Sequence, residues 1–207
     1  WAMASGWSIN AEFGLLHRIE MPVWMHACLA ILLLDLWTYW WHRANHRIPW
    51  LWRFHRAHHS DPWMDVSSGR RFHPGEILFS SLLRIPLIVL LGIHLEELAL
   101  YALLMSVVVD FHHANIALPE PVDRFLRTWI ATPAMHKVHH SRIRAETDSN
   151  YTSLFSLWDR VFGTFRLRPD LASIELGLDG WSEPSHQTMR GMLATPLSHL
   201  NSSDNIE

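Results

Sequence analysis

The sequence predicts an all-α membrane protein, built from transmembrane helices or a helical hairpin with a cytosolic helical cap. Three observations predict this class. Apolar residues make up 49% of the 207 residues and charged residues only 18%, against roughly 25% charged in soluble domains. There are twelve tryptophans, a residue type enriched at membrane interfaces. The apolar residues also gather in three long runs.

The first apolar run covers residues 22–41 and contains one charge, Asp35. As a helix it would rise about 30 Å, the thickness of a bilayer's hydrocarbon core. The second run, 77–92, is interrupted by Arg84 and Pro86, and the third, 98–109, is short. A hairpin entering only part of the bilayer is therefore an alternative to full spans, and a buried soluble core is another.

The distribution of arginine predicts the orientation of these helices. Arginines follow the first and third runs, whereas the turn at 93–97 contains neither Lys nor Arg. The positive-inside rule places the arginine-rich side in the cytoplasm. We therefore expect a multi-pass integral membrane protein with its active site on the cytoplasmic face. A net charge of −3 gives no reason to expect a nucleic-acid partner.

The organisation along the chain is expected to be a single domain over residues 1–207. Membrane helices are expected mainly in 1–113, and a cytosolic cap and tail in 114–207. Prolines predict short helices within 119–168, and the tail from about 169 is expected to be irregular. The sequence opens with Trp and shows no signal peptide, so we expect N-terminal helices to be missing.

Histidine is the abnormal component, with sixteen histidines against one lysine. Eleven of them lie in five short stretches, WHRANH, FHRAHH, RRFHPGE, DFHHAN and MHKVHH. On a helix, positions i, i+3 and i+4 share one face. Each HxxxH or HxxHH stretch therefore directs two or three imidazoles the same way, and the predicted topology brings the stretches together at one membrane boundary.

A cluster of about ten imidazoles predicts a dimetal site. So many rings cannot all be protonated without strong repulsion, and neutral imidazole is a good ligand for iron, zinc, copper and nickel. Ten ligands are too many for one ion but suit two ions with five each. Spacing alone cannot choose between His112 and His113, and His73 stands alone in its stretch.

Other residues are expected to support the imidazoles. Asp35, Tyr39 and His42 form a helical stripe, so Asp35 could orient imidazole N–H groups, unless it pairs with Arg84 or a backbone group. Asp110, three residues before His113, could also orient an imidazole. The histidines outside the five stretches are expected to be ordinary polar residues: His17, His26, His94, His186 and His199.

These stretches, together with DLWTYWWHRANH and SNYTSLFSLWDRVFGTF, resemble the fatty acid hydroxylase/sterol desaturase superfamily of integral-membrane di-iron enzymes. The resemblance covers residues 35 to about 166. It implies a helical membrane fold, two histidine-held iron ions and O2-dependent hydroxylation or desaturation of a lipid. Sterol, fatty acyl and ether lipids are all possible substrates. A metal-transporting or metal-storing membrane protein and a zinc-dependent lipid hydrolase are the alternatives.

By position, the resemblance implies ten metal ligands: His42, His46, His55, His58, His59, His73, His113, His136, His139 and His140. It favours His113 over His112, because the family histidine precedes a small residue and Asn. Positions expected near the site, without binding metal, are Asp35, Tyr39, Asp110, His112, Asn115, Asn150, Tyr151, Trp158 and Asp159. Thr152 stands where the family usually has Gly. A left-handed backbone would be strained at a Thr, so the local turn there is expected to differ.

The expected cofactors are two Fe ions, with Zn possible in a recombinant sample, and O2 as co-substrate. The expected partners are a lipid substrate, the bilayer and an external electron donor. No haem, flavin or ferredoxin motif occurs in the sequence, so the electrons would come from a cytochrome, a ferredoxin with its reductase, or a reduced pterin. Arginines on the cytoplasmic side could bind an acidic electron donor. Alternatively, they only set the membrane orientation and contact lipid headgroups.

Overall fold

The computed structural model describes residues 1–181 and 183–198, and over these residues the chain is helical with two isolated β-bridges and no strand. The helices, with 3-10 turns labelled η, are α1 (Ala2–Asn10), η1 (Leu16–Arg18), α2 (Val23–Arg47), α3 (Pro49–His59), η2 (Val66–Arg70), α4 (Pro74–Leu91), α5 (Leu95–His113), α6 (Glu120–Leu126), α7 (Pro133–His139), α8 (Arg144–Thr147), α9 (Leu157–Val161), α10 (Met189–Ala194) and η3 (Thr195–Leu197).

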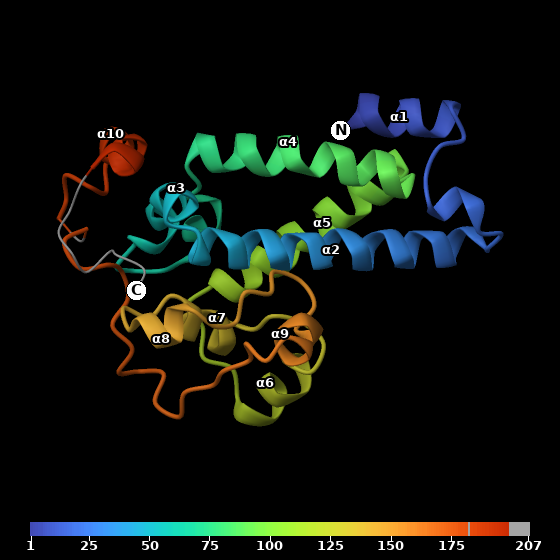
Figure 1. Ribbon diagram of the computed structural model, residues 1–207. Coiled ribbons are helices and arrows are strands. Elements are labelled where there is room, and N and C mark those ends of the chain that lie inside the picture. Colours follow the sequence, from blue (N-terminus) through green and yellow to red (C-terminus); the bar gives the residue numbers. More distant parts are fainter. Residues whose placement is uncertain (182, 199–207) are drawn as a thin grey trace.

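Three long helices form the main body of the molecule. Helix α2 runs along its length, and α4 and α5 form a hairpin that turns at residues 92–94 (Figure 1). Helix α1 lies against α4, and the cap helices α6 to α9 gather beside the second half of α2. Buried apolar residues such as Leu34, Ile88 and Tyr101 join the three long helices into one core.

Proline and glycine set several helix ends. Pro49 and Pro74 occupy the first position of α3 and α4, where the missing N–H costs nothing because it would have no helical partner. Gly92 ends α4 in the left-handed conformation with φ of 76°, which an L side chain rarely adopts. Pro86, one of the two residues that interrupt the second apolar run, lies inside α4, which continues through it.

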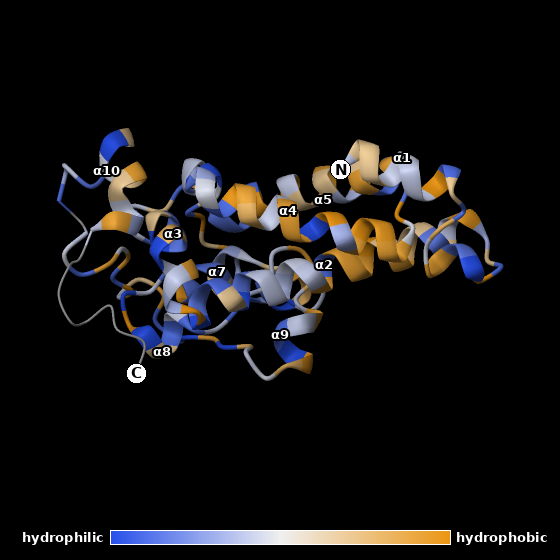
Figure 2. Cartoon of the chain, turned by 45° about the horizontal axis from the view of Figure 1, so that its top comes forward, coloured by the Kyte–Doolittle hydropathy of each residue, from blue (hydrophilic) through white to orange (hydrophobic). Residues whose placement is uncertain are grey.

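The molecule is an all-α membrane protein, as predicted. Helices α2 and α4 are long and apolar enough to cross a membrane. Figure 2 shows the hydrophobic residues concentrated on these long helices and the hydrophilic ones toward the cap. Large side chains on α4 and α5, including Leu82, Leu90, Leu103 and Val107, are exposed, whereas a soluble helical core would bury them.

Polar residues within the long helices face inward. Arg84 is buried, its guanidinium lies 4.8 Å from the Trp1 ring centre, and it contacts the Thr38 hydroxyl at 3.4 Å. Asp35 does not pair with Arg84. Its carboxylate accepts hydrogen bonds from the Phe155 backbone N–H at 3.0 Å and the Trp158 indole at 2.9 Å. Asp35 thus fastens the cap to α2, and these bonds do not orient a histidine ring.

The tail is less irregular than expected, since it contains α10 and η3. It folds back onto α3 through Arg56, a buried residue whose guanidinium donates to the carbonyls of Thr195 and Ser198. The same guanidinium stacks over the Trp181 ring at 4.2 Å. His199, expected to be an ordinary polar residue, lies outside the described residues.

Candidate metal centre

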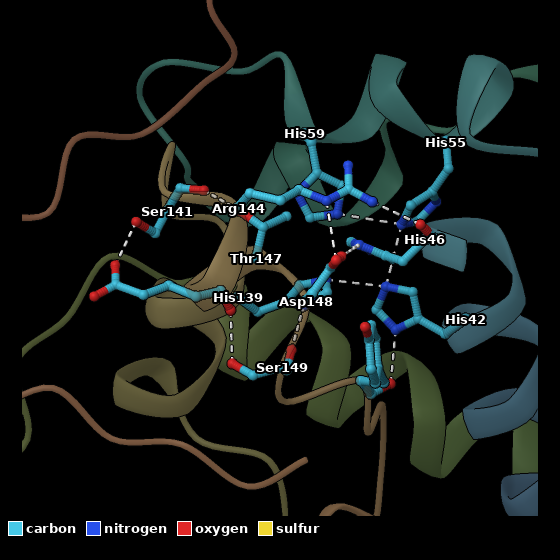
Figure 3. Close-up of polar contacts among 12 residues, drawn as sticks. His42, His46, His55, His59, His139, Ser141, Arg144, Thr147, Asp148 and Ser149 are labelled. Atoms are coloured by element: carbon cyan, nitrogen blue, oxygen red, sulfur yellow. Dashed lines mark hydrogen bonds and ion pairs between the residues drawn. The ribbon is translucent and has the colours of Figure 1, made fainter. Parts of the chain in front are cut away.

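Nine of the ten predicted ligands lie in two buried groups. Within each group, one ring nitrogen of every histidine lies within 4.8 Å of those of the other members. We call them the first and the second group. The first contains His42, His46, His55, His59 and His139, shown in Figure 3, and the second contains His58, His113, His136 and His140.

The two HxxHH stretches each contribute to both groups. On α3, His55 and His59 are four residues apart and join the first group, while His58 joins the second. The stretch beginning in α7 does the reverse, because His136 and His140 join the second group and His139 the first. Helical spacing thus divides each stretch between two adjacent sites.

Backbone carbonyls fix the orientation of several rings. The Nδ1 atoms of His42 and His139 lie 2.6 and 2.7 Å from the carbonyl oxygens of Tyr151 and Ser149. In the second group, the Nδ1 atoms of His58 and His113 lie 3.0 and 2.8 Å from the Ser68 and Val109 carbonyls. A carbonyl only accepts, so Nδ1 carries the proton and Nε2 of each neutral ring keeps its lone pair.

These lone pairs point at one another. The Nε2 atoms of His42 and His139 are 3.0 Å apart, and those of His58 and His113 are 3.4 Å apart. Neither member of such a pair has a proton to donate, so the two neutral rings repel at this separation. A cation between them reverses the sign of the interaction. The donor chemistry of both groups therefore fits a metal ion bound through Nε2.

Two carboxylates contact further Nδ1 atoms, and neither was predicted from the sequence. Glu76 is buried and accepts from His55 Nδ1 at 2.9 Å and from the Asn45 amide at 3.1 Å. Asp148 Oδ1 lies 3.4 Å from His46 Nδ1 (Figure 3). A carboxylate behind a ligating imidazole fixes its tautomer and raises its basicity. Glu76 belongs to the stretch RRFHPGE, so its position beside a histidine motif was an available signal.

The electrostatics favour uncharged rings. Five histidines in α3, in α7 and directly after α7 have a pKa well below 6.5. Burial is the main cause, and the neighbouring imidazoles are the second. These histidines are His58, His59, His136, His139 and His140. At neutral pH they are deprotonated at one nitrogen, which is the form that binds a metal.

His73 is not brought into either group. It caps α4, where its Nδ1 accepts from the Gly75 backbone N–H at 2.9 Å, and its Nε2 lies 3.3 Å from the Leu193 carbonyl. Both ring nitrogens are therefore engaged, and the side chain is partly exposed. His73 thus marks the start of α4, and it is Glu76, three positions later, that contacts a histidine of the first group, His55.

His112 lies beside the second group rather than turned away from it. It is buried, and its ring centre is 3.9 Å from that of His136 and 4.6 Å from that of His113. Neither of its nitrogens has a hydrogen-bond partner among the described residues. His112, expected near the site without binding metal, thus lies beside the rings of both His113 and His136.

Tyr39 and Asp159 support the loop that holds His42. The Asp159 carboxylate accepts from the backbone N–H groups of Tyr151 and Thr152 at 2.8 and 3.1 Å. Thr164 links Asp159 to the Tyr39 hydroxyl through contacts of 2.7 and 2.8 Å. These bonds position the Tyr151 carbonyl that accepts from His42, so both residues act through the backbone.

Asn150 also belongs to this support. Its amide donates to the Met135 carbonyl at 2.9 Å, which ties the loop to α7. Asn150, with φ of 51°, adopts the left-handed conformation, and Thr152 is not among the positive-φ residues. The left-handed backbone that would be strained at a Thr is therefore not adopted at Thr152.

Neither Asp110 nor Asn115 hydrogen-bonds a histidine of the two groups in the part of the chain that the structure describes. Asp110 forms an ion pair with Arg70 at 2.6 Å instead of orienting His113, whose Nδ1 is already held by a carbonyl. Asn115 is exposed. Both follow the end of the third apolar run, and their nearness in sequence to His113 does not place them at the site.

A cavity of about 490 Å³ connects the histidines with the interior of the helix bundle. His42, His58 and His113 line one part of it. Arg84 and Tyr101 line another part, between the long helices. The volume lies within the range of small-molecule sites, roughly 300–1,000 Å³. A ligand in this cavity would reach the Nε2 side of both groups from between the membrane helices.

Comparison with known proteins identifies the family of this chain. A family model described as fatty acid hydroxylase matches residues 27–164. The chain is 31% identical to an ornithine lipid hydroxylase of Rhizobium tropici, covering 78% of this chain and 48% of that protein. It is 31% identical to an alkylglycerol monooxygenase of Danio rerio, covering 74% of this chain and 34% of that protein.

A cholesterol 25-hydroxylase-like protein of Danio rerio is 32% identical, with 69% of this chain and 55% of that protein covered. The chain thus spans about a third to a half of the length of these curated relatives. No solved structure matches the chain. With two thirds of its residues matched, the histidine stretches included, the chain belongs to the fatty acid hydroxylase family.

Proposed function

We propose that this protein is a membrane-bound, non-haem di-iron oxidoreductase that uses O2 to hydroxylate or desaturate a C–H bond of a lipid. One observation carries the proposal: two adjacent groups of buried imidazoles, oriented with Nε2 inward, border a cavity that opens between apolar helices. The relatives named hydroxylases and monooxygenases of lipids support the reaction class.

The histidines would hold the two ions separately. The first group offers five nitrogens to one ion, and the second offers four, with the unpartnered His112 as the nearest candidate for a fifth. Two bound iron ions supply O2 activation and the oxidising power to take hydrogen from an unactivated C–H bond, which no side chain possesses. Glu76 and the backbone carbonyls would hold the imidazoles at fixed orientations toward the ions.

The cavity would bind the apolar part of the substrate. It lies among α2, α4 and α5, whose outer faces are apolar, so a lipid chain can enter laterally from the bilayer. Enclosure by these helices excludes water from the reacting carbon and sets which carbon lies beside the imidazole groups. We place this end of the molecule at the cytoplasmic face, where a cytochrome, a ferredoxin system or a reduced pterin supplies electrons.

The proposal is tested by metal analysis combined with oxygen uptake. Protein purified in detergent without chelators is analysed for iron, and O2 consumption is measured with a lipid extract and a chemical reductant. We expect two irons per chain and uptake that requires both lipid and reductant. Lipid analysis of a strain lacking the gene then identifies the precursor that accumulates.

The same measurements separate the competing functions. A metal transporter would bind ions without consuming O2 with lipid, and a zinc-dependent hydrolase would release water-soluble products without reductant. Zinc alone in the purified protein would not decide between them, because these imidazole sites also accept zinc during overexpression. Iron-reconstituted protein that consumes no O2 with any lipid fraction would contradict the proposal.

A further inference from the structure

A third histidine group lies at the opposite end of α2. His17 in η1, His26 near the start of α2, and His94 before α5 present ring nitrogens within 4.8 Å of one another. His26 precedes His46 by 20 residues, which separates the ends by about 30 Å along the helix axis. This is the thickness of a bilayer's hydrocarbon core, so the group lies at the other membrane boundary.

His26 is prepared as a ligand by a carboxylate. Its Nδ1 lies 2.5 Å from Glu97 Oε1, and the other Glu97 oxygen accepts from the His94 backbone N–H at 2.9 Å. With Nδ1 as the donor, Nε2 keeps its lone pair. The residue His26 is buried, only 8% exposed, and its Nε2 has no hydrogen-bond partner among the described residues. A carboxylate behind an imidazole is the arrangement common at metal sites.

His17 and His94 complete the group. Their Nε2 atoms are 3.2 Å apart, and the His26 and His94 rings have centres 4.7 Å apart. Two nitrogens that both bind one tetrahedral zinc, each at about 2.0–2.1 Å, would be separated by nearly the distance between the Nε2 atoms of His17 and His94.

The backbone brings His17 to this position through two glycines. Gly14 packs so closely on Gly92 that a Cβ at Gly14 would lie 2.4 Å from the Gly92 Cα. A Cβ on Gly92 would in turn lie 3.0 Å from the His17 ring. The Leu15 N–H also bonds to the Leu90 carbonyl at 2.8 Å. The loop carrying His17 therefore packs on the α4–α5 turn. This packing holds the His17 ring beside the other two rings.

We propose that His17, His26 and His94 bind a divalent transition ion of the zinc type through three imidazole nitrogens, with Glu97 holding the His26 ring. The ion is separate from the proposed pair of ions in the first and second groups. It connects three segments, the loop after α1, the start of α2 and the α4–α5 turn, at the boundary opposite to the cap. The site leaves a fourth tetrahedral position for water or a polar group of a ligand.

Zinc counting tests this proposal on the full chain in detergent. Wild-type protein, His17→Gln, His94→Gln and the control His186→Gln are saturated with zinc, freed of excess metal, and analysed for zinc per chain. We expect His17→Gln and His94→Gln to hold one zinc fewer than both wild type and His186→Gln. The difference of one does not depend on how many ions the first and second groups bind, so failure of the proposed function would not conceal it.

Two further measurements protect this test from misfolded variants. Glu97→Gln should bind the third ion 10- to 100-fold more weakly than wild type. Zinc anomalous diffraction from wild-type crystals should show a peak among the three rings. Equal zinc content in all four proteins, or an anomalous map without a peak at this position, would overturn the proposal. In either case His17 and His94 form only a hydrogen bond.

Discussion

The two ends of α2 both gather histidines, but they do so by different means. At the cap end, eight of the nine grouped histidines come from motifs with helical spacing, and short-range geometry already aims them together. At the opposite end, His17, His26 and His94 share no motif and meet only because a loop docks on the α4–α5 turn. Spacing therefore reveals a site built on helices, whereas a site built from one residue per segment becomes visible only after folding.

The ends differ also in how the rings are held. Four of the cap-end histidines have an Nδ1 facing a backbone carbonyl, and His55 has Glu76. At the opposite end one carboxylate, Glu97, serves His26. The cap end thus depends on loops as well as on helices.

His139→Ala should abolish turnover. The substitution removes one imidazole of the first group and leaves the facing lone pair of His42 without its partner. We expect loss of metal from the first group and no measurable lipid-dependent O2 uptake, while membrane insertion and the third group are unaffected. His186→Ala, which removes a histidine belonging to none of the groups, is the control. Normal turnover in His139→Ala would contradict the site.

Glu76→Ala should weaken metal binding without removing a ligand. Loss of the acceptor leaves His55 Nδ1 and the buried Asn45 amide unpaired, and carboxylates behind ligating imidazoles contribute roughly 10- to 100-fold in metal affinity. Metal affinity measured by competition with a chelator checks this. Glu175→Ala, an exposed glutamate paired with Arg142, should bind metal as wild type does. Equal affinity in the two variants would exclude an orienting role for Glu76.

Acid should destabilise the metal-free protein. Burial lowers the pKa of histidines such as His59 and His140 well below 6.5, so below pH 6.5 the unfolded chain binds more protons than the folded one. Stability therefore rises with pH and is lost as pH falls. The unfolding temperature of chelator-treated protein should be nearly constant above about pH 7.5 and fall below about pH 6.5. A rise on acidification would show that the rings are charged in the folded state.

Asp35→Ala should loosen the cap. It removes the acceptor of the Phe155 N–H and the Trp158 indole, and unpaired buried donors cost about 1–3 kcal/mol. Trp158→Phe removes one of these bonds and should cost about 1 kcal/mol. Thermal unfolding ranks the two variants against wild type. If Trp158→Phe is the less stable, the indole's packing rather than the Asp35 bond holds the cap.

The sequence predicts the elements better than it predicts their contacts. The apolar runs locate α2, α4 and α5 because a membrane helix needs only length and hydrophobicity, which are local properties. The histidine spacings likewise bring together eight of the nine grouped rings, and the family resemblance adds His113. Which carbonyl or carboxylate meets each Nδ1 depends on how distant segments pack together, so Glu76 in α4 and Asp148 after α8 were missed. Asp35 looked like a histidine partner on its stripe, yet the cap supplies nearer donors.

His73 and His112 show the same limit at single residues. The motif places His73 next to the other histidines in sequence, but its position before Pro74 makes it a helix cap. His112 and His113 are adjacent, and only the packing of α5 on α7 shows that both rings approach His136. Where these two rings point depends on the exact residue at which a helix begins or ends. A difference of one or two residues in that position would change the direction of the side chain.

The central claim is that imidazoles from α2, α3, α5 and α7 hold two separate ions. Iron-edge anomalous diffraction from crystals of anaerobically purified protein tests it most directly. We predict two peaks at the cap end, one among His42, His55 and His139 and one among His58, His113 and His136. A single peak, or none between these rings in iron-loaded protein, would contradict the claim.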